Sequence, residues 1–171
     1  MPHVILIGDS IRMSYQPVVQ RELAGVADVW GPEENGGDSD NVLAHLDEWV
    51  LCRGPALVHL NCGLHDLKTP FDSEQRQVPL DRYRENLERI FQRITETDGL
   101  QLIWATIRPV NQQRHHEARD FDRFERDVND YNAAARQVAR QFDVPINDLH
   151  SLVEQHGRDD LLGGDGVHFT E

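Results

Sequence analysis

A serine near the start of the chain, and an acid and a histidine near its end, could together do chemistry. Ser10 closes the turn-like tripeptide Gly8-Asp9-Ser10, and Asp165 and His168 stand three residues apart among glycines. That spacing lets a carboxylate hydrogen-bond an imidazole and orient it, and an oriented imidazole can take the proton of a serine hydroxyl. The three residues together predict nucleophilic acyl transfer. Each part alone is also typical of a plain turn.

The elements that would position these residues form an alternating pattern. Residues 4–7 are a continuous apolar run that ends at a glycine, as in a strand buried on both faces of a parallel sheet, and ligands bind at the carboxyl ends of such strands. Four more short apolar runs alternate with helical patterns, at residues 27–30, 56–60, 100–105 and 144–146. The alternation predicts an α/β fold, a three-layer α/β/α sandwich around a five-stranded parallel sheet.

The helix boundaries follow from caps and breakers. Pro17 suits a first helical position, so residues 10–15 are expected to form a loop. Ser39 or Asp40 is expected to cap the next helix. The strongest helical period in the chain runs from Phe121 to Phe142.

Length and charge limit the classes of function. The 171 residues fit one domain, 1–171, and the formal net charge of -13 disfavours nucleic acid and anionic membranes as partners. No signal peptide or stretch of transmembrane length is seen, although a removed leader would leave no trace. Cys52 and Cys62 show no metal-ligand spacing and are expected to be buried thiols. We therefore expect a cytoplasmic protein.

Four short blocks in order resemble the SGNH, or GDSL, hydrolases. They are Gly8-Asp9-Ser10-Ile11, Gly37-Asp38-Ser39, Gly63-Leu64-His65-Asp66 and Asp165-Gly166-Val167-His168. The resemblance spans nearly the whole chain. It implies a flavodoxin-like sandwich, no metal or other cofactor, and ester hydrolysis by a Ser-His-Asp triad. It also implies that Ser10 and Gly37 donate backbone N–H groups to the oxyanion.

The chain departs from the family in its third block. Most members have an asparagine as a third oxyanion donor where this chain has His65. A neutral imidazole keeps one N–H and can replace the amide as a donor. The alternative is that His65 buttresses its loop through Asp66.

A second departure concerns the C-terminal end of the sequence. The family usually continues past its histidine into an amphipathic helix, whereas this sequence stops at Thr170-Glu171. Either that helix is truncated here or something else covers the surface on which it would pack.

Other candidate sites are weaker. Arg12 and Arg108 could face the crevice and hold a polar leaving group, with surface charge as the alternative for each. The stretch His115-His116-Glu117 fits a solvated charged segment better than a metal site, because adjacent side chains diverge. The glycine motif of dinucleotide sites and the Gly-x-Ser-x-Gly elbow of α/β-hydrolases are missing.

The sequence therefore predicts a serine esterase. We expect short acyl groups, above all acetyl, on carbohydrates or similar polar alcohols, because the predicted rim loops carry polar residues and few aliphatic ones. The alternatives are a lysophospholipase or thioesterase acting on longer chains, and a binding protein that has lost catalysis on the same scaffold. A small-molecule or carbohydrate ester is the expected partner, and the sequence does not predict the oligomeric state.

Overall fold

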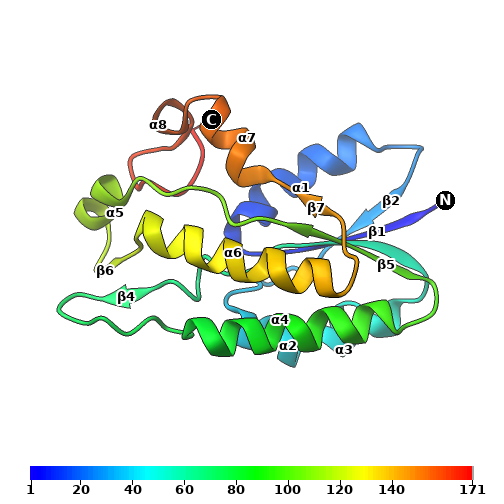
Figure 1. Cartoon of the computed structure of the whole chain (residues 1–171). Coiled ribbons are helices and arrows are strands. Elements are labelled where there is room, and N and C mark those ends of the chain that lie inside the picture. Colours follow the sequence, from blue (N-terminus) through cyan, green and yellow to red (C-terminus); the bar gives the residue numbers. More distant parts are fainter. Residues whose placement is uncertain (171) are drawn as a thin grey trace.

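A five-stranded parallel sheet forms the centre of the computed structural model, which describes residues 1–170 (Figure 1). The strand order is β2-β1-β3-β5-β7, and every pairing in this sheet is parallel. The predicted α/β sandwich is confirmed. The strands are β1 (His3–Ile7), β2 (Asp28–Trp30), β3 (Ala56–Leu60), β5 (Leu100–Ala105) and β7 (Ile146–Asn147).

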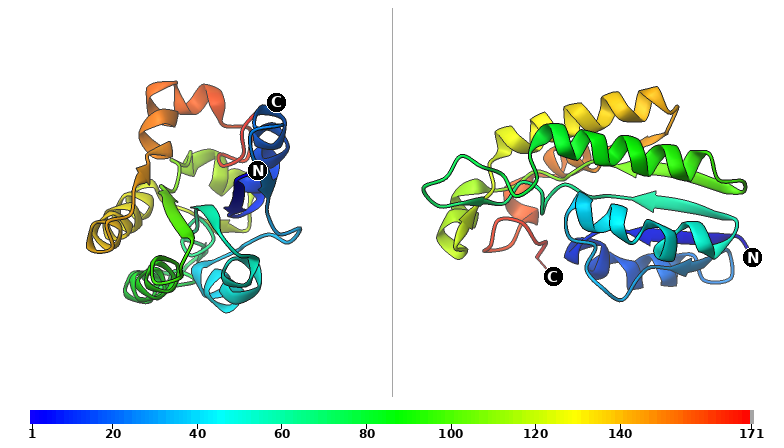
Figure 2. Two further views of the ribbon diagram at one scale, coloured as in Figure 1. Left: turned by 90° about the vertical axis from the view of Figure 1, so that its right-hand side faces the viewer. Right: turned by 90° about the horizontal axis from the view of Figure 1, so that it is seen from below.

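Helices cover the sheet in two unequal layers. One layer holds α2, α3, α4 and α6, and α1 and α7 lie on the opposite face (Figure 2). The helices are α1 (Ser10–Glu22), α2 (Ser39–Ala44), α3 (Leu46–Trp49), α4 (Leu80–Thr95), α5 (Gln112–Ala118), α6 (Glu125–Gln141), α7 (Leu149–Gln155) and α8 (Arg158–Leu161), with a 3-10 turn at Leu51–Arg53. None of the helices within residues 1–170 combines the length and apolar character needed to span a bilayer.

The main core lies between the sheet and the layer of α4 and α6. Alternate strand residues face this layer and are fully buried, among them Ile5, Val58 and Trp104. Tyr83 and Tyr131 meet at the α4–α6 contact with ring centroids 4.9 Å apart, and each hydroxyl donates to a backbone carbonyl. The two tyrosines therefore close the contact between α4 and α6 with both hydroxyls hydrogen-bonded.

The opposite face of the sheet is less completely covered. Between α1 and α7 runs a largely apolar groove of about 450 Å³, whose floor includes Val4, Leu6, Leu57 and Ile103. Whether a C-terminal helix of the family type, or something else, covers this surface stays a prediction.

The start of α1 differs from the expectation of a loop at residues 10–15. The helix begins at Ser10 and runs through Pro17, because the Asp9 carboxylate caps it by accepting the Ile11 N–H at 2.9 Å. The next cap also differs, since Asp38 rather than Ser39 or Asp40 accepts the Asn41 N–H. In both places an acid just before the helix satisfies a free first-turn donor.

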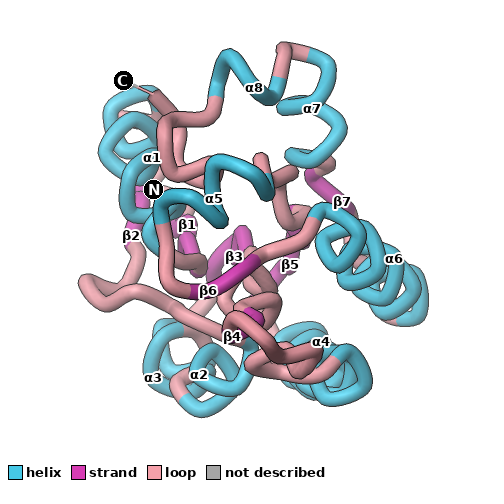
Figure 3. The backbone as a smooth tube through the Cα atoms, turned by 90° about the vertical axis from the view of Figure 1, so that its left-hand side faces the viewer, coloured by secondary structure: helices cyan, strands magenta, loops and turns pink. Residues whose placement is uncertain are grey.

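Two further details correct the sequence-based expectations. Phe121 does not belong to a helix: it lies in β6 (Phe121–Asp122), which pairs antiparallel with β4 (Thr69–Pro70) to form a small second sheet (Figure 3). Of the two cysteines, Cys62 is buried as expected but Cys52 is exposed, and both are free thiols.

Candidate active site

The serine, histidine and acid predicted from the two ends of the chain lie in contact. Ser10 is the first residue of α1, at the carboxyl end of β1, and its Oγ lies 2.8 Å from Nε2 of His168. The other ring nitrogen of His168, Nδ1, lies 2.6 Å from Oδ2 of Asp165. This is the relay in which an imidazole can take the serine proton while a carboxylate orients the ring.

Asp165 is held as a carboxylate by several donors. Its Oδ1 accepts the backbone N–H groups of Val167 at 3.1 Å and His168 at 2.9 Å. Its Oδ2 accepts from Arg119 Nη2 at 2.8 Å as well as from the His168 ring. Burial opposes ionisation, yet these hydrogen bonds outweigh it and the pKa of Asp165 is lowered well below its ordinary value. The carboxylate is therefore charged throughout the neutral range.

The loop that carries Asp165 and His168 is fastened to the N-terminal end of α5. Gly166 has a φ of +69°, and a Cβ there would stand 2.3 Å from the carbonyl oxygen of Asn111. Asn111 donates its N–H to the Gly166 carbonyl at 2.8 Å, and Nδ1 of His115 lies 3.1 Å from the Asp165 carbonyl. His115 is fully buried, so the expectation of a solvated stretch is wrong for this residue.

The second block approaches the nucleophile through contact between two backbones. Gly36 donates its N–H to the Gly8 carbonyl at 3.0 Å, and a Cβ on Gly36 would stand 2.6 Å from that oxygen. The next N–H, that of Gly37, donates to Oδ1 of Asn35 at 2.9 Å. The predicted oxyanion donor is therefore engaged by an exposed side chain of its own loop.

His65 is a neutral group beside buried charges. Burial lowers the pKa of His65 to about 4; the negative charge of Asp9 opposes this shift, and the positive charges of Lys68 and Arg123 reinforce it. Within residues 1–170 no hydrogen bond joins the His65 ring to another residue. A neutral ring with a free N–H meets the chemical requirement for an oxyanion donor.

Asp66 makes no hydrogen bond to His65. The alternative, in which His65 buttresses its loop through Asp66, required one. Asp66 is fully buried, and its carboxylate accepts from both the backbone N–H and the hydroxyl of Ser39. Burial raises the pKa of Asp66 to about 7, although the bonds from Ser39 favour the charged form. Asp66 thus ties the third block to Ser39, which ends the second block and begins α2.

Comparison with known proteins assigns the family. Residues 6–171 match the model of the GDSL-like lipase/acylhydrolase family. The chain belongs to this family. As a GDSL-like acylhydrolase it is a carboxylic ester hydrolase. The comparison with curated proteins found no match.

Solved structures share the GDSL-like fold of this chain at low sequence identity. A lipase/acylhydrolase from Enterococcus faecalis superposes with a TM-score of 0.78 at 23% identity, covering 100% of this chain and 88% of its own. The acetyl xylan esterase AlAXEase gives 0.77 at 17% identity, covering 98% and 91%. A structure of TesA gives 0.73 at 19% identity, covering 98% and 89%.

The two arginines predicted as substrate contacts lie in different environments in the GDSL-like scaffold. Arg12 is 3% exposed and donates to the carbonyls of Pro32 at 2.8 Å and Glu34 at 2.7 Å. Its guanidinium holds the loop before Gly36 and is not turned toward a leaving group. The expectation of a crevice-facing Arg12 is therefore not supported, and neither is the alternative of surface charge.

Arg108 is also buried, at 9% exposure, and it lines the apolar groove between α1 and α7. Its guanidinium carbon lies 4.8 Å from the centroid of the ring of Phe169, the residue that follows His168. Burial lowers the pKa of Arg108 to about 10, against the opposing effect of Asp9. The alternative of surface charge is therefore wrong for Arg108, and its role toward substrate stays a prediction.

Sequence reasoning missed three residues that support the GDSL-like site. They are Asn35, which engages the Gly37 N–H; Arg119, which binds Asp165; and Arg123, which is 6% exposed and donates to the Leu64 carbonyl at 2.7 Å. The two arginines bond residues 46 and 59 positions away, so no local pattern could reveal them. For Asn35 the signal was present, because Asn followed by glycines favours a local side-chain-to-backbone turn.

Proposed function

We propose that the protein is a serine esterase in which Ser10, His168 and Asp165 act as the catalytic triad. Ser10 Oγ attacks the acyl carbonyl while His168 takes its proton, and His168 returns that proton to the leaving alcohol. Water then attacks the acyl-enzyme by the same route and releases the acid. The observation that carries the proposal is the continuous contact from Ser10 Oγ through His168 to Asp165, at 2.8 Å and 2.6 Å.

Three groups are proposed to bind the oxyanion. Ser10 begins α1, and the first-turn N–H groups of a helix have no partner within the helix. The Gly37 N–H becomes a second donor when the oxyanion replaces Asn35 Oδ1. The neutral His65 ring is the third, in place of the usual amide.

The proposed substrate is a short acyl ester, above all an acetyl ester, of a carbohydrate or similar polar alcohol. Two observations support this class. Polar groups, namely Asn35, His65 and the buried charge of Asp9, surround the loops beside the serine. The fold is also similar to that of an acetyl xylan esterase.

The triad is tested by replacing its nucleophile. Ser10→Ala should abolish hydrolysis of p-nitrophenyl acetate and labelling by a fluorophosphonate probe, with an unchanged melting temperature. Ser14→Ala is the matched control, because Ser14 lies exposed one turn further along α1. Hydrolysis that survives Ser10→Ala would overturn the assignment, and a wild-type serine that resists the probe would favour a binding protein.

The acyl specificity is tested with p-nitrophenyl esters of increasing chain length. We expect kcat/KM to be highest for acetate and to fall with each added carbon. A binding site for long chains would instead add about 0.8 kcal/mol per buried CH₂, or roughly fourfold in kcat/KM. A rise that continues beyond about six carbons would contradict the acetyl proposal and support the lysophospholipase or thioesterase alternative, leaving the triad assignment intact.

A further inference from the structure

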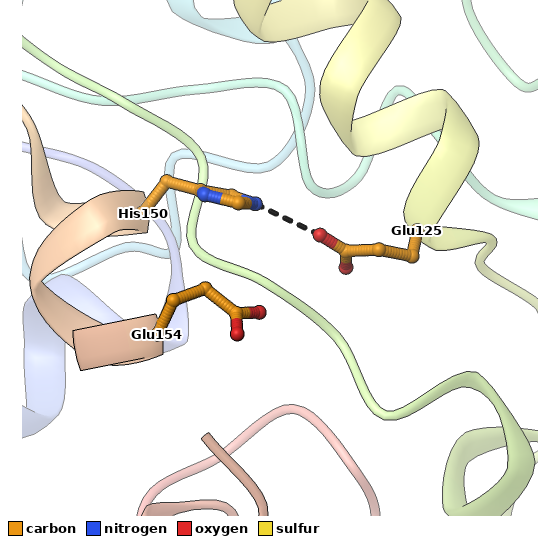
Figure 4. Close-up of side chains that lie close together, drawn as sticks. All are labelled: Glu125, His150 and Glu154. Atoms are coloured by element: carbon orange, nitrogen blue, oxygen red, sulfur yellow. Dashed lines mark hydrogen bonds and ion pairs between the residues drawn. The ribbon is translucent and has the colours of Figure 1, made fainter. Parts of the chain in front are cut away.

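A second group of chemically capable side chains lies where α7 meets α6. His150 and Glu154 are four residues apart in α7, and Glu125 is the first residue of α6. Residues four apart project from one face of a helix, and both side chains point toward Glu125 (Figure 4). One imidazole nitrogen and two carboxylate oxygens lie within 4.8 Å of one another.

The contacts around this cluster place one imidazole ring beside two carboxylates. His150 Nε2 lies 2.8 Å from Oε1 of Glu125, while Oε2 of Glu125 accepts the Val110 N–H at 2.8 Å. Glu154 forms an ion pair with Arg158 at 3.7 Å, and Arg158 also pairs with Asp159 at 2.8 Å. Two carboxylates thus lie beside one imidazole ring, and the Arg158 guanidinium borders one of them. The hydrogen bond to Glu125 accordingly raises the pKa of His150, against the effect of burial.

The donor set is one that suits zinc. One imidazole nitrogen with two carboxylate oxygens leaves a fourth position for water, as in three-ligand zinc sites. Ca²⁺ and Mg²⁺ prefer oxygen ligands alone, so the nitrogen favours a transition-metal ion. With metal–ligand distances of about 2.0–2.2 Å, the Nε2 and Oε1 atoms need to separate only slightly from 2.8 Å. Glu154, whose side chain is 43% exposed, is free to turn inward.

The surroundings also hold two of the ligands in place. The Val110 N–H orients the Glu125 carboxylate, and the backbone N–H of His150 donates to Oγ1 of Thr106 at 2.9 Å. Such outer contacts fix the direction of a metal ligand. The His150 and Glu125 side chains are 19% and 23% exposed, which leaves an entry path from solvent.

We propose that Glu125, His150 and Glu154 form a binding site for Zn²⁺ or a divalent ion of similar preference. The ion binds Nε2 of His150 and displaces the proton from that nitrogen; below the pKa of His150, where the ring carries two protons, one of them goes to solvent. It joins α7 to the start of α6, and α7 leads into the loop that carries Asp165 and His168. None of its three residues belongs to the proposed triad, so the ion takes no part in the proposed ester hydrolysis.

The test is zinc titration of the metal-free protein, with calorimetry and thermal unfolding as readouts. Wild-type protein should bind one ion at this site, release a proton on binding, and melt at a higher temperature with Zn²⁺. Affinity should weaken by up to tenfold per pH unit once the pH falls below the pKa of His150, because protons compete for Nε2. Mg²⁺ and Ca²⁺ at the same concentration should produce no comparable shift.

Glu154→Gln isolates the site, because Glu154 is exposed and its loss leaves the Glu125–His150 pair intact. The matched control is Glu48→Gln, an exposed glutamate on α3 with the same change of charge. We expect Glu154→Gln and His150→Gln to lose most of the zinc-induced rise in melting temperature and Glu48→Gln to keep it. An equal rise in wild type and Glu154→Gln, or an equal rise with Mg²⁺, would overturn the proposal.

Discussion

The two halves of the proposed catalytic centre differ in how far they are assembled. On one side, Ser10, His168 and Asp165 already make the bonds that proton transfer needs, and four donors surround the Asp165 carboxylate. On the other side, the Gly37 N–H is engaged by Asn35, and the His65 ring bonds no other residue in the described part of the chain. We infer that the triad is preorganised, whereas the oxyanion donors complete their bonds only with substrate.

This difference means that substitutions on the two sides should have different kinetic signatures. Changes to the triad remove a group that takes part both in forming the acyl-enzyme and in its hydrolysis by water. Changes on the oxyanion side remove a bond that strengthens only in the transition state, so they should lower kcat with little effect on KM.

The largest effect is expected for Asp165→Asn. An amide cannot accept the Nδ1–H of His168 as a carboxylate does, and it favours the wrong tautomer, so kcat should fall by about 10⁴. Esterase kinetics measure this fall in kcat. The control is Asp160→Asn, an exposed residue on α8 whose replacement changes the charge by the same amount. A loss below tenfold would mean that Asp165 does not orient His168 during catalysis.

Next in size is His65→Ala, which tests the oxyanion side. Losing one donor should lower kcat by about 10²–10³ with KM nearly unchanged, and His65→Asn should recover much of it because an amide N–H replaces the imidazole N–H. Steady-state kinetics of the two variants show whether the His65 side chain donates to the oxyanion or only shapes its loop. If kcat and KM worsen together and asparagine gives no recovery, His65 only shapes its loop.

The third prediction concerns acid stability and the same histidine. Burial lowers the pKa of His65 to about 4 in the folded chain, whereas in the unfolded chain this pKa has its ordinary value of 6.5. The unfolded chain therefore binds the extra proton between these values, and the free energy of unfolding falls as the pH drops through this window.

Urea unfolding at pH 7 and pH 4.5 measures this effect. Wild-type protein should lose about 2 kcal/mol more than His65→Asn, which has nothing to protonate at this position. Equal losses in the two proteins would show that the folded site admits the proton freely and that His65 is not held neutral.

The smallest effect is expected for Asn35→Ala, which frees the Gly37 N–H. Because the bond is exposed, its net contribution is modest, and kcat/KM should rise by about two- to fivefold. Glu33→Gln, exposed in the same loop, is the control. A fall in activity would instead mean that Asn35 holds the loop in its working shape, and the contrast between the two sides would weaken.

The sequence predicted the features that depend on local patterns. The strands at 56–60 and 100–105 were placed at their observed bounds, because a short apolar run between breakers leaves little choice. The contact between Ser10 and His168, which are 158 positions apart, was predicted from the residue types at the two ends of the chain and from the resemblance of the four blocks to the GDSL hydrolases.

What sequence reasoning could not supply depends on side-chain direction and distant partners. Whether Arg12 faces solvent or the carbonyls of its own loop depends on how the loop folds back, and this is not visible in the spacing of residues. The start of α1 was misjudged because Asp9 caps the helix well before Pro17, which the helix then accommodates in its interior. The pair β4–β6 has two residues per strand, too few for a periodic signal.

The uneven covering of the sheet has a consequence for how the enzyme loses activity on warming. The segment 149–168 buries only three apolar side chains below one tenth exposure, those of Val153, Leu162 and Val167, whereas α4 and α6 share the main core. Regions with few buried apolar contacts open at lower free energy than the whole fold. Amide hydrogens of α7 should therefore exchange faster than those of α6. On warming, the segment 149–168, which carries the proposed base His168, should detach reversibly before the sheet melts.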